Sequence, residues 1–262
     1  DALLGGGVLS GEVCALIGPT RSAKTQLCLG MAAETLARTD AAVLYVSACH
    51  CFDKQRVHAL MRRRLGCAAD FMAPLSPDDD CSLRMARQLR VCIAETLPKL
   101  CQVLEQLLVG YPAAQADWFC RLRLLVVDPV FGAILAEATC TPSSTAAAQL
   151  ARLQRLLREI ASRLRLAVLV TSACAQHASP HTANTELPSV LALKPVAAHV
   201  WQHVAHVRVL MQSCDRLASD PSVSAEPVTH TATLVKSYHC ARRLRVGTSA
   251  SFRVCSEGLI SQ

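Results

Sequence analysis

Eight consecutive residues near the start of the chain have the types and spacing of a loop that holds phosphate groups. They match the pattern GxxxxGK[ST] except at the second glycine, where an alanine stands; in order they are Gly18, Pro19, Thr20, Arg21, Ser22, Ala23, Lys24 and Thr25. In such a loop the lysine reaches the β and γ phosphates of a nucleotide, and the hydroxyl group ligates Mg²⁺. The pattern therefore predicts a site for ATP and Mg²⁺.

Ala23 is the departure of this loop from the pattern. A methyl group there is tolerable if the φ angle is negative, but it crowds a loop that wraps closely around anionic oxygens. Two other interpretations stay open: a turn whose lysine binds nothing, and a degenerate loop that keeps the fold without ATP. The flanking sequence favours binding, because a strand pattern at residues 13–17 precedes the loop and a periodic helix at about 26–37 follows it. Backbone N–H groups and the positive helix end would then face a triphosphate.

A carboxylate further along the chain fits the same chemistry. Residues 124–127 are the most strand-like block of the sequence, and the block ends at Asp128. An aspartate at the end of such a strand holds the metal through water in phosphate-binding enzymes, although it is also a common turn or cap residue. Its pairing with Lys24 and Thr25 favours the metal role. We therefore expect Thr25 and Asp128 to converge on one magnesium ion.

Strands and helices alternate along most of the chain. A parallel crossover needs an intervening helix, so this alternation predicts a mainly parallel twisted α/β sheet covered on both faces. The later strands have few helices between them, which predicts an antiparallel extension at one edge. The expected strands are 43–46, 91–94, 124–127, 167–171, 204–211, 232–236 and 251–255; the expected helices are 54–64, 97–108 and 146–164; residues 74–80 and 176–189 are expected to be loops.

Composition limits the class of protein. With 262 residues, 52% of them hydrophobic and 18% charged, the chain is long and apolar enough for one large α/β domain. No apolar run approaches the roughly 20 residues that span a bilayer, so we expect no membrane association. The 14 cysteines lack CxxC spacing and indicate a reduced nuclear or cytosolic compartment, and adjacent ligands such as Cys49, His50 and Cys51 rarely close a metal site. The net charge of +7 favours polyanionic partners only mildly.

Several segments resemble the RecA/RadA recombinases, and within them the eukaryotic recombinase paralogs, most closely the D-type paralog. The resemblance implies a RecA-type P-loop ATPase core over residues 1–262, with ATP at the protomer edge and two mobile loops facing DNA, after Asp128 and in 177–197. It also implies that a small helical domain precedes Asp1, in agreement with the absent initial methionine. The segments are 11–13, 24–26, 44–46, the strand ending at Asp128, 193–195, Trp201, 208–210, and Lys236 with Ser237.

The departures from the family concern hydrolysis rather than binding. Cys49 lies where the family places the glutamate that activates the attacking water, and a thiol cannot act as that base in the same geometry. The γ-phosphate-sensing glutamine of the family maps to Ala173. Arg56 matches an arginine that lies against adenine, and together with Gln26 it joins the loop in the expected nucleotide-binding set. We therefore expect ATP binding with slow hydrolysis and no confident catalytic residue.

The expected DNA contacts are weak. Lys194 is the only lysine or arginine between Gln176 and Ala198, so the second loop has little charge for a phosphate backbone at neutral pH. The arginines of the long helix, among them Arg155, suggest a basic stripe, but Glu159 pairs with Arg155 at i,i+4, and a solvated helix face is the commoner explanation.

Three functions follow from these observations. The first is a nuclear accessory protein of homologous-recombination DNA repair, which acts with other recombinase paralogs and the main recombinase to promote filament assembly on single-stranded DNA. The second is an active DNA-dependent strand-exchange ATPase, which needs a carboxylate in place of Cys49; Glu34 and Glu95 are not obviously placed for this. The third is a RecA-fold interaction module without a nucleotide.

Overall fold

A computed structural model describes most of the chain. The described residues are 2–4, 6–66, 79–110, 116–130, 143–176, 193–195, 204–213, 228–238, 245–255 and 258–261. Most of both loops expected at 74–80 and 176–189 lies outside this set, as do Trp201 and the segment that follows Val130.

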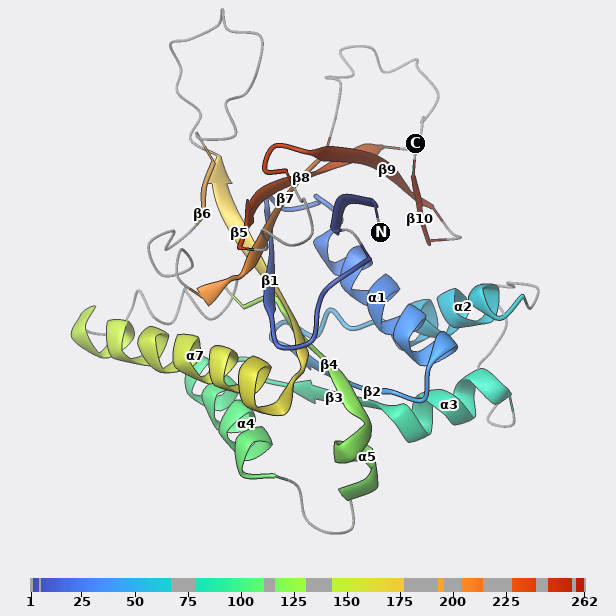
Figure 1. The fold of residues 1–262 in the computed structure, drawn as a ribbon, viewed down its shortest axis with the longest axis horizontal. Coiled ribbons are helices and arrows are strands. Elements are labelled where there is room, and N and C mark those ends of the chain that lie inside the picture. Colours follow the sequence, from blue (N-terminus) through green and yellow to red (C-terminus); the bar gives the residue numbers. More distant parts are fainter. Residues whose placement is uncertain are drawn as a thin grey trace, which may run out of the picture.

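A ten-stranded mixed sheet forms the centre of the described structure (Figure 1). Its order is β10-β9-β8-β7-β1-β5-β4-β2-β3, and β6 pairs with β5. The pairs from β3 to β7 along this order are parallel, whereas β8, β9 and β10 add antiparallel strands after β7. The sequence-based prediction of a mainly parallel sheet with an antiparallel C-terminal edge is therefore confirmed. The strands are β1 (Val13–Gly18), β2 (Ala42–Ser47), β3 (Leu89–Ile93), β4 (Leu122–Asp128), β5 (Ala167–Gln176), β6 (Leu193–Pro195), β7 (Val207–Ser213), β8 (Thr229–Ser237), β9 (Ser249–Cys255) and β10 (Gly258–Ser261).

Helices cover both faces of the parallel part of the sheet, as Figure 1 shows. On one side lie α1 (Lys24–Arg38), α2 (Lys54–Arg64) and α3 (Asp80–Gln88), and on the other lie α4 (Leu97–Val109) and α7 (Ser143–Leu164). A 3-10 helix, η1 (Ala2–Leu4), and the short α5 (Ala116–Arg121) complete the described elements.

Alternate residues of β1 contribute to two hydrophobic cores, one on each face of the sheet, because the side chains of a strand alternate between the faces. Val13, Ala15 and Ile17 belong to the core beneath α4 and α7. Cys14 and Leu16 belong to the core beneath α1, α2 and α3. All six residues of β1 are buried, which explains why the strand reads as a continuous apolar run in the sequence.

Several element boundaries differ from the sequence-based prediction. The first helix begins at Lys24 instead of about residue 26, because Ala23 already forms its N-cap, so the lysine and the hydroxyl of the motif lie in its first turn. The fifth strand continues to Gln176, beyond the predicted end at residue 171. The elements α3, α5, β6 and β10 were not predicted; the last three span six residues or fewer, too few to show a period.

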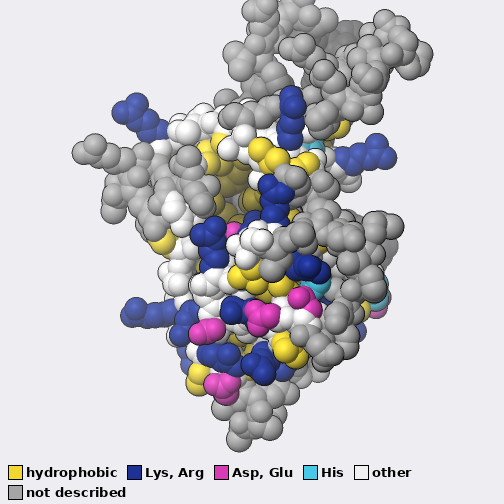
Figure 2. All heavy atoms as spheres, turned by 90° about the vertical axis from the view of Figure 1, so that its right-hand side faces the viewer, with side chains coloured by type: hydrophobic (Ala, Val, Ile, Leu, Met, Phe, Trp, Pro, Cys, Tyr) yellow, Lys and Arg dark blue, Asp and Glu magenta, His cyan; other side chains and the backbone are white. Residues whose placement is uncertain are grey.

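Charged side chains are largely interspersed. Figure 2 shows basic and acidic groups side by side on the face turned toward the viewer. On α7, Arg152 pairs with Glu105 at 2.5 Å, and Glu159 pairs with Arg163 at 2.6 Å, so the prediction that Glu159 pairs with Arg155 was wrong. Within the described part of the chain, no helix has both the length and the hydropathy needed to cross a membrane.

Candidate nucleotide-binding site

The predicted phosphate loop connects β1 to α1 at the carboxyl end of the parallel strands. It leaves the sheet at Gly18, where a β-carbon would lie 2.1 Å from the carbonyl oxygen of Met211 and 2.6 Å from Oγ of Ser22. Since one of these contacts is with backbone on the neighbouring β7, a larger residue at position 18 would displace the loop from the sheet. The first position of the motif therefore has room only for glycine.

Ala23 has a left-handed backbone, with φ at 63° and ψ at 15°. The condition under which a methyl group is tolerable at this position, a negative φ angle, is therefore not met. The position demands the conformation that glycine adopts without steric cost, and Arg21 lies in the same region, with φ at 62°. Because each non-glycine residue in this conformation costs about 1–2 kcal/mol, the loop carries local strain.

Lys24 holds its ammonium group inside the loop. Its Nζ donates to the carbonyl oxygens of Gly18 at 2.8 Å and Pro19 at 2.6 Å, and to Oγ of Ser22 at 3.1 Å. The hydroxyl of Ser22 in turn donates to the carbonyl of Pro19 at 2.8 Å. The ammonium group thus lies where the motif places phosphate oxygens, and in this structure it donates to carbonyl oxygens of the loop itself.

Asp128 ends β4 with its side chain almost fully buried, at 2% exposure. Its Oδ2 accepts a hydrogen bond from the hydroxyl of Tyr45 at 2.7 Å, and its Oδ1 accepts one from the hydroxyl of Thr171 at 2.5 Å. Burial, with smaller effects of the neighbouring Cys28 and Asp128, raises the pKa of Tyr45 far above its ordinary value, so the phenol stays protonated and remains a donor.

Cys51 lies beside the same carboxylate. Its Sγ is 3.8 Å from Oδ2 of Asp128 and 3.7 Å from Oγ of Ser47. Burial and the charge of Asp128 raise the pKa of the Cys51 thiol to about 12, so the group is neutral at physiological pH.

A cavity of about 470 Å³ brings the loop and the carboxylate together. Thr25 and Asp128 both line it, as the sequence led us to expect of two groups that share one metal ion. Hydroxyl and carboxylate oxygens are the ligands that Mg²⁺ prefers, and an ammonium group beside backbone N–H groups suits phosphates. The donors present therefore fit a magnesium-nucleotide complex. The described lining residues are Thr20, Arg21, Ser22, Ala23, Lys24, Thr25, Gln26, Cys49, Cys51, Asp128, Pro129, Thr171, Ala173, His230 and Val254.

Arg56, like Gly18 and Pro19 of the predicted nucleotide contacts, lies outside the described lining of the cavity. Its Nε donates to Oε1 of Gln26 at 3.2 Å, and its Nη2 donates to the carbonyl of Cys255 at 2.6 Å. The side chain thus connects the first turn of α1 with the last residue of β9. Burial is the main cause of a lowered pKa of Arg56.

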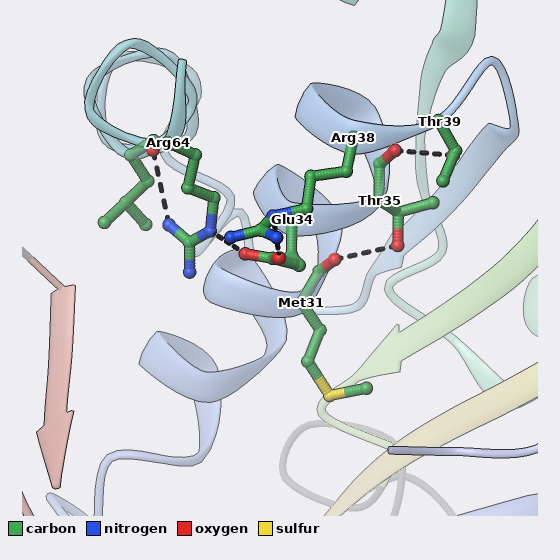
Figure 3. A network of polar contacts seen from close by, with 7 residues as sticks. Met31, Glu34, Thr35, Arg38, Thr39 and Arg64 are labelled. Carbon is green, nitrogen blue, oxygen red and sulfur yellow. Dashed lines mark hydrogen bonds and ion pairs between the residues drawn. The ribbon is translucent and has the colours of Figure 1, made fainter. Parts of the chain in front are cut away.

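The carboxylates considered as replacements for the absent glutamate lie elsewhere. Glu34, on the third turn of α1, pairs with Arg38 at 2.5 Å and with Arg64 of α2 (Figure 3). Glu95 bonds Nε2 of His50 at 2.6 Å, and about half of both side chains is exposed. Among the described residues of the cavity wall, Asp128 is the carboxylate, and Cys49, the residue that the sequence predicts at the glutamate position, also lines the wall.

Sequence reasoning missed several residues of this cavity. Tyr45 and Thr171, which bind the carboxylate, lie in apolar strands where their hydroxyls carry no motif. His230 and Val254 line the cavity from the antiparallel strands β8 and β9. Nothing in the local sequence marks these positions; only the strand order brings them to the loop.

Comparison with known proteins supports the family resemblance. Over 213 residues the chain is 26% identical to DNA repair protein RAD51 homolog 4 from Bos taurus, across 81% of this chain and 59% of the relative. The resemblance to the recombinase paralogs that the sequence suggested is thus supported by a relative named as a RAD51 homolog. The chain spans less than two thirds of the length of this curated relative. Its fold is similar to that in the crystal structure of the RadB recombinase, with a TM-score of 0.66 and 20% identity over 99% of this chain and 94% of that one. No protein-family model matches the chain.

Proposed function

We propose that this chain is the ATP-binding core of a recombinase paralog. The observation that carries the proposal is the shared cavity of the phosphate loop and Asp128, with Lys24 and Thr25 in the first turn of α1. In the proposed site, residues from Gly18 to Gln26 surround the phosphates, and Thr25 and Asp128 hold Mg²⁺, which neutralises phosphate charge when bound. Arg56 supports the site indirectly, because its Nε donates to the side chain of Gln26. Residues 1–262 would form one RecA-like core.

The biological role that fits this core is homologous-recombination DNA repair in the nucleus. The curated relative is by name a DNA repair protein, and the fold is that of a recombinase. We place this chain in a complex with other recombinase paralogs and the main recombinase, where it assists filament assembly on single-stranded DNA. The scarcity of cations in residues 177–197 favours DNA contact through the complex rather than by this chain alone.

Hydrolysis in the proposed site is weak. A general base contributes roughly 10²–10⁴-fold to such a reaction, and the described cavity wall offers Cys49 in place of a glutamate. The neighbouring Cys51 is neutral, since burial raises the pKa of its thiol to about 12. ATP would then stabilise the folded core by linkage, as a structural ligand.

Binding of Mg-ATP to the purified chain tests the proposal, with Lys24→Ala as the informative variant. We expect calorimetry to detect binding by the unaltered protein and a loss of about tenfold or more in affinity on substitution, because a charge-assisted contact to phosphate is worth roughly 1.5–3 kcal/mol. Lys54→Ala, an exposed lysine at the start of α2, is the matched control and should bind normally. Equal affinity of the Lys24 variant and the unaltered protein contradicts the assignment.

A nucleotide-free interaction module is the second candidate. The bonds of Lys24 to loop carbonyls favour it, because they satisfy the ammonium group without phosphates. Ala23 favours it as well, because a methyl group crowds a loop that must wrap closely around phosphate oxygens. Absence of any Mg-ATP binding by the unaltered protein would establish this alternative. Robust ATP turnover stimulated by DNA would instead indicate an active strand-exchange ATPase.

A further inference from the structure

Asp128 accepts one hydrogen bond from a hydroxyl group on each of the two strands that flank β4. In the sheet, β4 lies between β5 and β2, and Asp128 is the last residue of β4. Tyr45 belongs to β2 and Thr171 to β5, and both side chains are fully buried. The three residues are far apart in sequence, so the sheet order alone creates this arrangement.

The two hydroxyls bind different oxygens of the carboxylate. Tyr45 donates to Oδ2 at 2.7 Å, and Thr171 donates to Oδ1 at 2.5 Å. The terminal torsion of an aspartate is broad when nothing restrains it, whereas two attachments on opposite oxygens fix the plane of the group. Each carboxylate oxygen has a second lone pair, so the group can still accept from water or a metal-bound water.

Only one of the two donors reaches the cavity. Thr171 and Asp128 are both among its lining residues, while Tyr45 is not. The phenol approaches the carboxylate from the core beneath α1, α2 and α3, where the centroid of its ring lies 4.8 Å from that of Phe52. Tyr45 can therefore influence a bound metal only through Asp128, whereas Thr171 lines the cavity itself.

Satisfying a buried charge is the simpler role for these hydroxyls, since a buried carboxylate without donors is costly. That role predicts a loss of stability on their removal and nothing specific to a metal. A fixed carboxylate plane in the cavity that Thr25 also lines predicts, in addition, a change in metal dependence. The two roles are thus separable by experiment.

We infer that Tyr45 and Thr171 are positioning residues that orient Asp128 toward the magnesium ion of the proposed nucleotide site. The inference rests on the proposed function. It gives two residues of apolar strands a role in Mg²⁺ binding, and neither residue belongs to the phosphate-loop pattern.

The test compares Tyr45→Phe and Thr171→Val with the unaltered chain by measuring ATP affinity across Mg²⁺ concentrations and in EDTA. Losing a hydrogen bond to a charged group should raise the Mg²⁺ concentration for half-maximal binding by about tenfold, while affinity in EDTA stays within about twofold. Thr171→Ser keeps a hydroxyl and should restore the original Mg²⁺ dependence. Thr233→Val is the matched control, because its hydroxyl bonds Ser249 at 2.7 Å between β8 and β9.

Each outcome decides between the roles. An unchanged Mg²⁺ dependence in both variants, or an equal shift in Thr233→Val, overturns the positioning role. If Tyr45→Phe does not fold, the pair Thr171→Val and Thr171→Ser decides, and failure of the serine to restore the dependence overturns the inference. If the unaltered chain binds no ATP even with Mg²⁺, the proposed function fails first, and that result is distinct from a failure of the inference.

Discussion

Replacing Ala23 by glycine should stabilise the protein, although glycine is normally the destabilising residue. At φ 63° the alanine pays for the contact of its β-carbon with the backbone, about 1–2 kcal/mol in the left-handed region. Glycine removes this cost but brings a more flexible unfolded chain, which is worth about 0.4–1 kcal/mol in the opposite direction. The difference predicts a gain of about 0.5–1 kcal/mol for Ala23→Gly.

Thermal unfolding measures this gain directly. For a chain of this size, about 0.5–1 kcal/mol corresponds to a rise of about 1–3 °C in Tm. The matched control is Ala151→Gly, at an exposed position within α7, where glycine should cost about 0.5–1 kcal/mol and lower Tm. If both substitutions lower Tm by similar amounts, Ala23 does not occupy the left-handed conformation, and the argument that the loop is strained is refuted.

Further predictions concern the thiols of the cavity. Cys49→Glu should raise ATP turnover by about tenfold or more, because it supplies a general base, whereas Cys49→Gln should not. Equal rates in the two variants would show that residue 49 is not the position of the general base. Iodoacetamide at pH 8 should alkylate exposed Cys49 well before Cys51, whose pKa of about 12 leaves little thiolate, and peptide mass spectrometry with and without ATP reads both sites. Since the pKa of Cys51 rises on folding from 9.0 to about 12, its protonated form contributes stability that is complete below pH 9 and lost as pH rises toward 12. Urea melts across this range should show the decline, and Cys51→Ala should make it less steep without removing it, because burial also raises the pKa values of Cys14 and Cys28.

Local sequence predicted the loop because every requirement of the loop is local. An apolar strand, a glycine, a lysine with a hydroxyl and a periodic helix follow one another within a few turns of chain, and each has its own signature. The left-handed backbone of Ala23 was not predictable, since the alanine residue type does not indicate a positive φ angle. The confirmed sheet class followed from the alternation of strands and helices, which again is a sequential property.

The contacts of Asp128 show what local sequence cannot supply. Its partner Tyr45 is 83 residues away and its partner Thr171 is 43 residues away. Neither hydroxyl interrupts the apolar pattern enough to mark a function, because both point from buried strands. Their meeting depends on β4 lying between β2 and β5, and strand order is set by the packing of the whole sheet rather than by any one segment.

Arg56 explains how the late strands become part of the site. It is predicted to lie against the nucleotide base, and in the structure its guanidinium joins Gln26, in the first turn of α1, to the carbonyl of Cys255. His230 and Val254, from the same antiparallel strands, complete the cavity wall. Because Gln26 directly follows Lys24 and Thr25, any shift of this turn toward phosphates strains or releases the bond to Arg56. The antiparallel extension is therefore linked to the first turn of α1 through the side chain of Arg56, and a contact of this arginine with the nucleotide base stays a prediction.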